Sequence, residues 1–241
     1  MAGHNEPTAT RTGDLAAALL AEDVVLCIVG LGQSWMQGGN RDRVDALATP
    51  APEHPGMALQ LNAPTRPNAP YVPALRDLHE LEGGDRRRER PLSGCADIFE
   101  RLLIGRIGRR RPLLMLAAAR GGTTLAGGLI PDDGLLPGSV IYEWMLRQVG
   151  QAVELLARRG KRLVVISILA AHGETDAQLG VSGEAFAHGW RRLRREAEQA
   201  IFALTGQSHP ILLHAYQTTG LDRRSAQNAG ATAAPVAWWP L

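Results

Sequence analysis

Four short apolar runs, spread along the chain, constrain its fold more than any other feature. They are VVLCIVG (24–30), PLLMLAAA (112–119), RLVVISIL (162–169) and PILLHAY (210–216). They are continuously apolar. A strand with one solvated face would instead alternate between apolar and polar residues. A strand in a parallel sheet is covered by helices on both faces, and this produces continuous apolar runs of such a length. The runs therefore predict strands of a parallel sheet.

Helical patterns fill the intervals between these runs. Segments 95–108, 139–160 and 182–206 carry apolar residues at a spacing of three or four. The side chains expected to share an apolar face in the first two segments are Ile98, Phe99, Leu102, Leu103, Ile141, Met145, Val149, Val153 and Leu156. The expected helix caps are Ser93 and Ser182 at N-termini, and the expected stops are Gly160 and Gly206. Alternating strands and helices predict an α/β domain with a parallel sheet between helices.

Residues 41–92 interrupt the alternation with many prolines and the run GGDRRRER. A long segment of this kind is typical of a functional or disordered loop, and we expect a surface excursion over one end of the sheet. The chain then divides into a polar segment (1–20), an α/β domain (21–220) and a tail (221–241). The tail ends in AWWPL, and this aromatic pair is expected to pack against the domain or a partner, because its exposure is costly.

The overall charge argues against a general polyanionic partner, since the 241 residues carry a formal net charge of only +2. Arginine runs occur at 85–90, 108–111 and 191–196. Single-stranded nucleic-acid binding would require aromatic residues interleaved with these runs, and few are present. We therefore expect solvated arginine faces and no nucleic-acid partner.

Two cysteines, Cys27 and Cys95, are too few for a zinc knuckle or a disulfide framework. Cys27 lies inside an apolar run and is expected to be a small buried hydrophobe. No metal or other cofactor is expected. The N-terminus lacks a basic region followed by a long apolar run, and nothing approaches the roughly 20 apolar residues of a membrane span. We expect no signal peptide, no membrane span, and a cytoplasmic or particle-associated location.

The turn after the first run, GLGQSWMQGG (30–39), admits several interpretations. A dinucleotide-binding turn needs a third small residue where Trp35 stands, and a phosphate loop needs a Gly-Lys-Ser/Thr sequence that is absent. The nucleophile elbow of α/β-hydrolases needs a glycine where Met36 stands. Two interpretations remain open for Ser34: a nucleophile, or a structural serine in a glycine-rich turn.

Two further glycine-containing turns follow later strands. They are AAARGGTTLAGG (117–128) and AAHGETDA (170–177). Because the carboxyl ends of parallel strands meet at one edge of a sheet, where ligands bind in such folds, we expect these turns to converge with the turn of Ser34.

The blocks GQSWMQG, ARGGTTLA and HGETDA, in this order, resemble those of the SGNH hydrolases. They are most similar to the sialate O-acetylesterase-like carbohydrate esterases, whose usual forms are GQSNM-x-G, GGT or GGS, and QGE-x-DA. The resemblance runs from about residue 24 to about 230. It implies a flavodoxin-like, three-layer SGNH fold, a serine acyl-enzyme mechanism and an acetylated carbohydrate or cell-surface glycan as partner. By position, Ser34 matches the nucleophile, and its own N–H and that of Gly122 match oxyanion-hole donors.

The same resemblance assigns the remaining site residues. Gln33 matches the glutamine beside the nucleophile, while Gly173, Glu174 and Asp176 match the turn that shapes the floor of the site. The chain departs from the pattern at three positions, where Trp35, His172 and Thr175 replace the usual residues. The Thr175 hydroxyl offers a weak donor at best, and His172 is expected to line the turn, with a catalytic role as the open alternative.

The largest departure concerns the base, which the family carries in an Asp-x-x-His motif beyond the last core strand. No such motif follows Gln217, and the nearest approach, Asp222 to Ser225, ends in serine. A serine without a base is a poor nucleophile at neutral pH. The other histidines are expected as follows: His214 in the core or at a strand end, His188 and His209 at the surface, and His54 and His79 in the long segment.

Two hypotheses follow. The chain is a carbohydrate O-deacetylase whose Asp-x-x-His comes from a second polypeptide or from a segment absent here. Alternatively, it is a non-catalytic glycan-binding or structural protein that kept the fold, for example in a phage-like particle.

Overall fold

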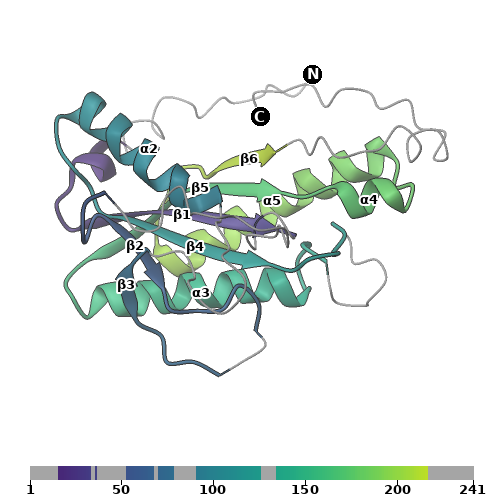
Figure 1. Cartoon of the computed structure of the whole chain (residues 1–241), viewed down its shortest axis with the longest axis horizontal. Coiled ribbons are helices and arrows are strands. Elements are labelled where there is room, and N and C mark those ends of the chain that lie inside the picture. Colours follow the sequence, from purple (N-terminus) through teal and green to yellow (C-terminus); the bar gives the residue numbers. More distant parts are fainter. Residues whose placement is uncertain are drawn as a thin grey trace, which may run out of the picture.

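The computed structural model describes residues 16–33, 36, 53–67, 70–78, 91–125 and 134–216. Within these residues, one six-stranded sheet forms the centre of the molecule (Figure 1), with the strand order β3-β2-β4-β1-β5-β6. All neighbouring strands are parallel except β2 and β3. The strands are β1 (Val24–Gly32), β2 (Ala58–Leu61), β3 (Leu75–Asp77), β4 (Leu113–Ala119), β5 (Arg162–Ala171) and β6 (Leu212–Tyr216).

Helices cover both faces of this sheet. They are α2 (Pro91–Ile107), α3 (Val140–Ala157), the short α4 (Glu174–Gln178) and α5 (Gly183–Thr205). Side chains of α3 and α5 pack on one face of the sheet, and those of α2 pack on the other. The α/β, three-layer architecture predicted from the apolar runs is confirmed.

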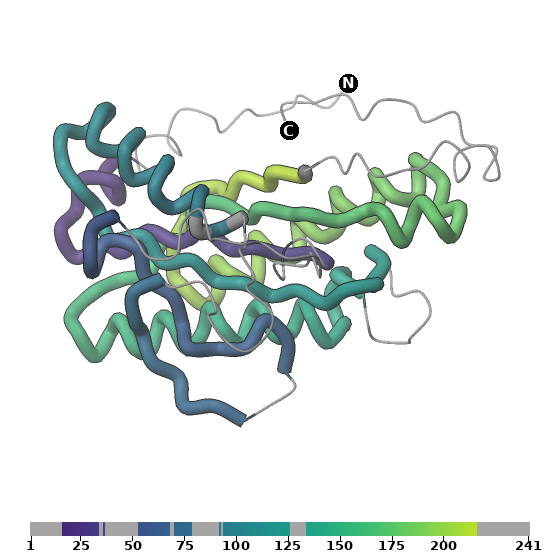
Figure 2. Tube along the Cα trace, viewed as in Figure 1, coloured from purple at the N-terminus to yellow at the C-terminus, as the bar shows by residue number. Residues whose placement is uncertain are grey.

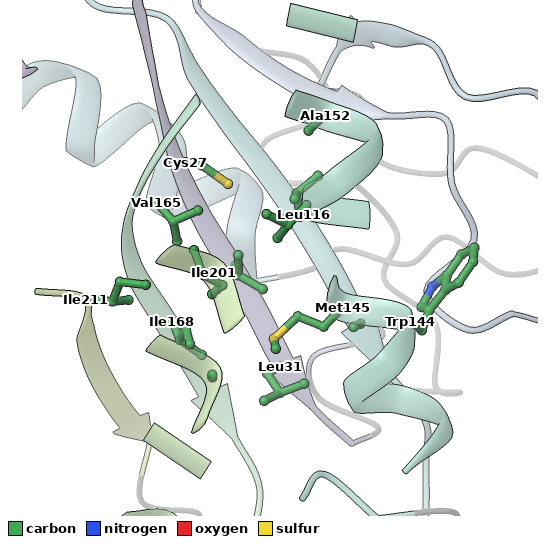
Figure 3. Close-up of a cluster of buried hydrophobic side chains, with 14 of the residues drawn as sticks. Cys27, Leu31, Leu116, Trp144, Met145, Ala152, Val165, Ile168, Ile201 and Ile211 are labelled. Atoms are coloured by element: carbon green, nitrogen blue, oxygen red, sulfur yellow. The ribbon is translucent and has the colours of Figure 1, made fainter. Parts of the chain in front are cut away.

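Strand β1 shows why the run VVLCIVG becomes a central strand. Its side chains alternate between the two cores: Cys27 and Leu31 face α3 and α5, while Leu26 and Ile28 face α2. Both sets are fully buried, which is possible only for a strand covered on both faces. Figure 3 shows the first core, where Leu31 of β1 lies near Met145 of α3, and Cys27, further back along β1, lies closer to Val165 of β5.

The pairing of β1 with β5 has one irregularity. Cys27 pairs with Val165, but the next residue, Ile28, pairs with Ser167, so that Ile166 has no counterpart. Such an extra residue is a bulge, which interrupts the regular ladder. Beyond it the register is regular again as far as Gly32 and Ala171.

The caps of α5 lie where the sequence predicts them. The Ser182 side chain accepts a hydrogen bond from the backbone N–H of Ala185, and Gly206 ends the helix in a left-handed conformation. Helix α3 has Ser139 as its N-cap and ends at Ala157, three residues before the predicted stop at Gly160.

The prediction for α2 is wrong in two respects. The helix begins at Pro91, so Ser93 lies inside its first turn rather than at the cap; proline is well suited to a first helical position because it has no N–H to satisfy. Ile98 and Leu102 are 61% and 59% exposed, whereas Phe99 and Leu103 pack against the sheet. The apolar stripe is therefore wider than the strip of helix that contacts the sheet.

The prediction of a long surface excursion over residues 41–92 is also wrong for its described part. This segment contributes β2 and β3 to the sheet and the start of α2. Strand β2 has only four residues, and one of them, Gln60, is polar, buried and donates to the Asp77 carbonyl. A short strand with an internal polar residue has no recognisable apolar pattern.

Residues 1–15 and the tail beyond Tyr216 lie outside the described residues, and so do the predictions made for them. Among the residues that are placed, none of the helices combines the length and the apolarity that crossing a bilayer needs.

Candidate functional site

The carboxyl ends of β1, β4 and β5 meet at one edge of the sheet (Figure 2). Gly32, the last residue of β1, pairs with Ala119 on one side and with Ala171 on the other. Two backbone hydrogen bonds continue this pairing into the turns: Gln33 N–H donates to the Ala171 carbonyl at 3.1 Å, and Arg120 N–H donates to the Gly32 carbonyl at 3.1 Å. The predicted convergence of the three turns is therefore present in the described residues.

The turn after β1 is held tightly where it leaves the sheet. Gln33 is buried, and its carbonyl accepts a hydrogen bond from Met36 N–H. Ser34 and Trp35, between these two residues, lie outside the described residues. The structure therefore fixes both neighbours of this pair and gives no position for the predicted nucleophile itself.

Close packing explains both glycines of GLGQ. A Cβ on Gly30 would lie 2.5 Å from Met36 Sδ and 2.9 Å from a methyl of Leu92. A Cβ on Gly32 would lie 2.2 Å from the Ala171 carbonyl oxygen. All three distances are shorter than the contacts that Cβ atoms make in proteins, so the strand can approach its neighbours this closely because both residues lack a side chain.

The turn after β4 contains the predicted oxyanion donor. Gly122 is exposed and has a positive φ of 79°, a conformation that glycine adopts readily. Thr123 and Thr124 are buried directly after it, and the Thr123 hydroxyl donates to the Arg120 carbonyl at 3.0 Å. The turn thus folds back on itself and leaves Gly122 at its tip.

The turn after β5 begins with His172 and Gly173 and leads into α4. Thr175, on the first turn of that helix, donates from its hydroxyl to Gln33 Oε1 at 3.0 Å. This bond joins the third turn to the first. The predicted site residues Gln33, Gly173 and Thr175 therefore lie together, and Glu174 lies between the last two along the chain.

A buried pair, His172 and Asp176, lies under this turn. His172 Nε2 is 2.8 Å from Asp176 Oδ2, and both side chains are almost completely buried. The contact is not aligned as a hydrogen bond, and Nδ1 has no partner. Trp190 of α5 packs edge-on against the ring, with 6.3 Å between ring centroids. Sequence reasoning placed both residues at the turn, but nothing in the sequence pairs them with Trp190.

Unpartnered polar atoms gather at this edge. Within the described residues, the buried side-chain atoms without a hydrogen-bond partner include Thr124 Oγ1, Glu174 Oε2, Trp190 Nε1 and His172 Nδ1. Buried polar groups are normally satisfied, and exceptions mark places where water, an ion or a ligand supplies the missing bond. The edge therefore offers donors and acceptors to a polar ligand.

The other described histidines lie away from this edge. His54 contacts Glu100 and Arg110 near the start of β4, at the opposite edge of the sheet. His188 is exposed, as predicted. Two predictions are wrong: His209 is buried beside Gln207, and His214 is an exposed residue of β6 rather than part of the core. His79 lies outside the described residues.

The described residues contain no group of three or more His, Cys, Asp or Glu side chains able to hold a metal ion. Cys27 is fully buried, and burial raises the pKa of its thiol far above the usual range. Its thiolate is therefore not accessible as a nucleophile at neutral pH.

No protein-family model matches the sequence, and comparison with curated proteins finds no match. Among solved structures, the chain is similar to a protein from Arabidopsis thaliana, AT4G34215, with 18% identity and a TM-score of 0.54 over 85% of this chain and 79% of that chain. It is also similar to NanS, with 14% identity and a TM-score of 0.53 over 88% of this chain and 72% of that chain. A third match is a carbohydrate acetylesterase from Xanthomonas citri, XAC1771, with 18% identity and a TM-score of only 0.40, over 78% of this chain and 40% of that chain. The first two similarities show the fold alone, an SGNH-like α/β fold with a mostly parallel six-stranded sheet between helices.

Proposed function

We propose that the protein is an esterase that removes acetyl groups from carbohydrates, with Ser34 as its nucleophile. One observation carries the proposal: backbone hydrogen bonds from Gln33 and Arg120 bind the turn that leads into Ser34 directly against the turns of the other two motifs. This observation supports the proposal because an α/β sheet binds its ligands at this edge. The SGNH-like fold is consistent with this chemistry, but fold alone does not establish it.

In the proposed reaction, Ser34 Oγ attacks the carbonyl carbon of an O-acetyl group and its proton passes to a base. The charge that develops on the carbonyl oxygen is met by the backbone N–H groups of Ser34 and Gly122. Donors of this kind contribute roughly 3 kcal/mol each. The bond to the sugar oxygen breaks, the sugar hydroxyl leaves with a proton, and water then releases acetate from the acetyl-serine.

The base is the part of this mechanism that the sequence does not supply in its usual form. The alternative function, a glycan-binding protein without turnover, needs no base. The unpartnered polar atoms at the edge suit either function, since both need a polar ligand.

Hydrolysis of p-nitrophenyl acetate and of acetylated sugars by the isolated chain tests the proposal. The matched pair is Ser34→Ala and Ser167→Ala, because Ser167 is a buried serine of β5 that takes no part in the turns. We expect turnover that Ser34→Ala abolishes and Ser167→Ala preserves, with an acetyl adduct on the peptide that contains Ser34. Absence of wild-type turnover on all these substrates, or turnover that survives Ser34→Ala, would overturn the esterase. In the first of these cases, calorimetric titration with the same sugars would then test the binding function.

A further inference from the structure

One buried carboxylate joins the turn of Gly122 to the turn after β5. Both oxygens of Asp176 accept hydrogen bonds from the backbone N–H of Leu125, at 3.0 and 3.1 Å. Because Asp176 lies on α4, this contact spans two loops that are separated by 51 positions in the chain. This contact holds the far end of the Gly122 turn.

The Gly122 turn, residues 120–125, is therefore anchored at both ends. At its start, Arg120 N–H donates to the Gly32 carbonyl of β1. At its end, Leu125 is held by Asp176, while its own carbonyl accepts from Leu135 and Leu136. The Leu125 side chain packs so closely on α5 that a Cβ on Gly189 would lie 2.5 Å from its Cδ2 atom. The position of Gly122 N–H depends on these two anchors.

His172 contacts the Asp176 carboxylate directly. Its Nε2 lies 2.8 Å from Oδ2, on the carboxylate that also receives Leu125 N–H. Trp190 confines the ring from the side of α5. A carboxylate buried among apolar neighbours is costly unless donors or a positive group surround it. Without His172, Asp176 would keep a single backbone donor among its described partners and would lose the group that sets its orientation.

We propose that His172 is a positioning residue, which acts through Asp176 to hold the turn of Gly122 in place. This assignment rests on the proposed function for its catalytic consequence. A donor displaced by a fraction of an ångström stabilises a transition state far less than one correctly placed, although substrate still binds. The effect of losing His172 therefore falls on kcat, with KM little changed.

The two amides that imitate histidine provide matched variants. The side-chain nitrogen of glutamine can take the place of Nε2, whereas that of asparagine takes the place of Nδ1 and is too short to reach Asp176. We expect His172→Asn to lower kcat roughly 10- to 100-fold, with KM within about threefold of wild type. His172→Gln should retain kcat within about threefold. His188→Ala, at an exposed position of α5, serves as the control and should match wild type.

Amide hydrogen exchange of Leu125 measures the same contact without any turnover. We expect exchange at Leu125 to accelerate about tenfold or more in His172→Asn and to stay near the wild-type rate in His172→Gln and His188→Ala. If His172→Asn does not fold, His172→Ser replaces it. The serine side chain is too short to reach Asp176, so this variant should also accelerate exchange at Leu125 and lower kcat.

The outcomes separate this inference from the esterase function. If the wild-type protein shows no serine-dependent turnover, the proposed function fails, and Leu125 exchange alone still decides the positioning role. Unchanged exchange in His172→Asn, or in His172→Ser where that variant replaces it, would overturn the inference. It would also be overturned if His172→Gln lost activity as completely as His172→Asn, together with the acid limb of the pH–rate profile, while exchange stayed normal; His172 would then be the base.

Discussion

Replacement of Gly32 by alanine should test how closely the ends of β1 and β5 approach each other. The new Cβ would lie 2.2 Å from the Ala171 carbonyl oxygen, about 1.2 Å short of the 3.4 Å at which ordinary contact begins. The obstacle is backbone on a neighbouring central strand, so no side chain can rotate out of the way. The ends of β1 and β5 must separate instead.

The cost has two parts. Overpacking of this kind typically costs about 1–3 kcal/mol, and the separation also weakens the hydrogen bond from Gln33 N–H to the same carbonyl, which is worth about 1 kcal/mol. We therefore expect a loss of about 2–4 kcal/mol in the free energy of unfolding. In a chain of this size that corresponds to a fall in Tm of roughly 5–15 °C.

Gly105→Ala is the matched control. Gly105 is an exposed residue of α2, and nothing lies within 4 Å of the Cβ that alanine would add. Alanine is favoured over glycine in a helix by about 0.5–1 kcal/mol, so the Tm of the Gly105→Ala protein should rise by roughly 1–4 °C. Thermal unfolding followed by circular dichroism measures both variants. A Gly32→Ala protein with the Tm of wild type would refute the argument, because the overlap would then have been relieved at no cost.

Two further predictions concern buried polar groups. The Ser167 hydroxyl is buried in β5 without a hydrogen-bond partner, so Ser167→Ala should raise the free energy of unfolding by about 0.5–1 kcal/mol in urea titrations; a loss of stability would show that the hydroxyl is satisfied after all. Burial, aided by Glu196 and Glu143, raises the pKa of Tyr142 to about 12, above its usual value near 10 in the unfolded chain. The folded state therefore favours the protonated phenol, and the stability this gives is complete below pH 10 and is lost as the pH rises towards 12. Between pH 9 and pH 11, the free energy of unfolding measured in urea should fall less for Tyr142→Phe than for wild type. An equal fall in both proteins would contradict the raised pKa of Tyr142.

The strands that carry the site could be predicted from the sequence because their apolar character is continuous. The strand formed by VVLCIVG contacts helices on both faces, so its residues are apolar on both faces as well. Strand β2 could not be found in this way. Its four residues include the polar Gln60, whose buried side chain donates a hydrogen bond to β3. A contact of this kind with another strand produces no recognisable pattern in the local sequence.

The convergence of the three turns was predictable, but the side-chain contacts between them were not. Glycines and small polar residues after three strands placed Gln33, Gly122 and Asp176 at one edge. The bond from Thr175 to Gln33 and the double acceptance by Asp176 join residues that are far apart in the chain. Likewise His209 is buried because Gln207 spans from α5 to β5 and holds it there. Such contacts depend on tertiary packing, which residue spacing does not encode.

The extra residue in β5 has a consequence for which side of the sheet each later residue faces. Before Ile166, the odd-numbered residues Leu163 and Val165 face α3 and α5; after it, the even-numbered Ile168 does. For the rest of the strand, the even-numbered side chains therefore face α3 and α5, and the odd-numbered ones face α2. Position 172 continues the inverted series and points its ring at Trp190 of α5. In an uninterrupted ladder the same residue would face α2, on the far side of the sheet from Trp190. A single unpaired residue, deep in the strand and six positions upstream, thus determines which core the histidine enters.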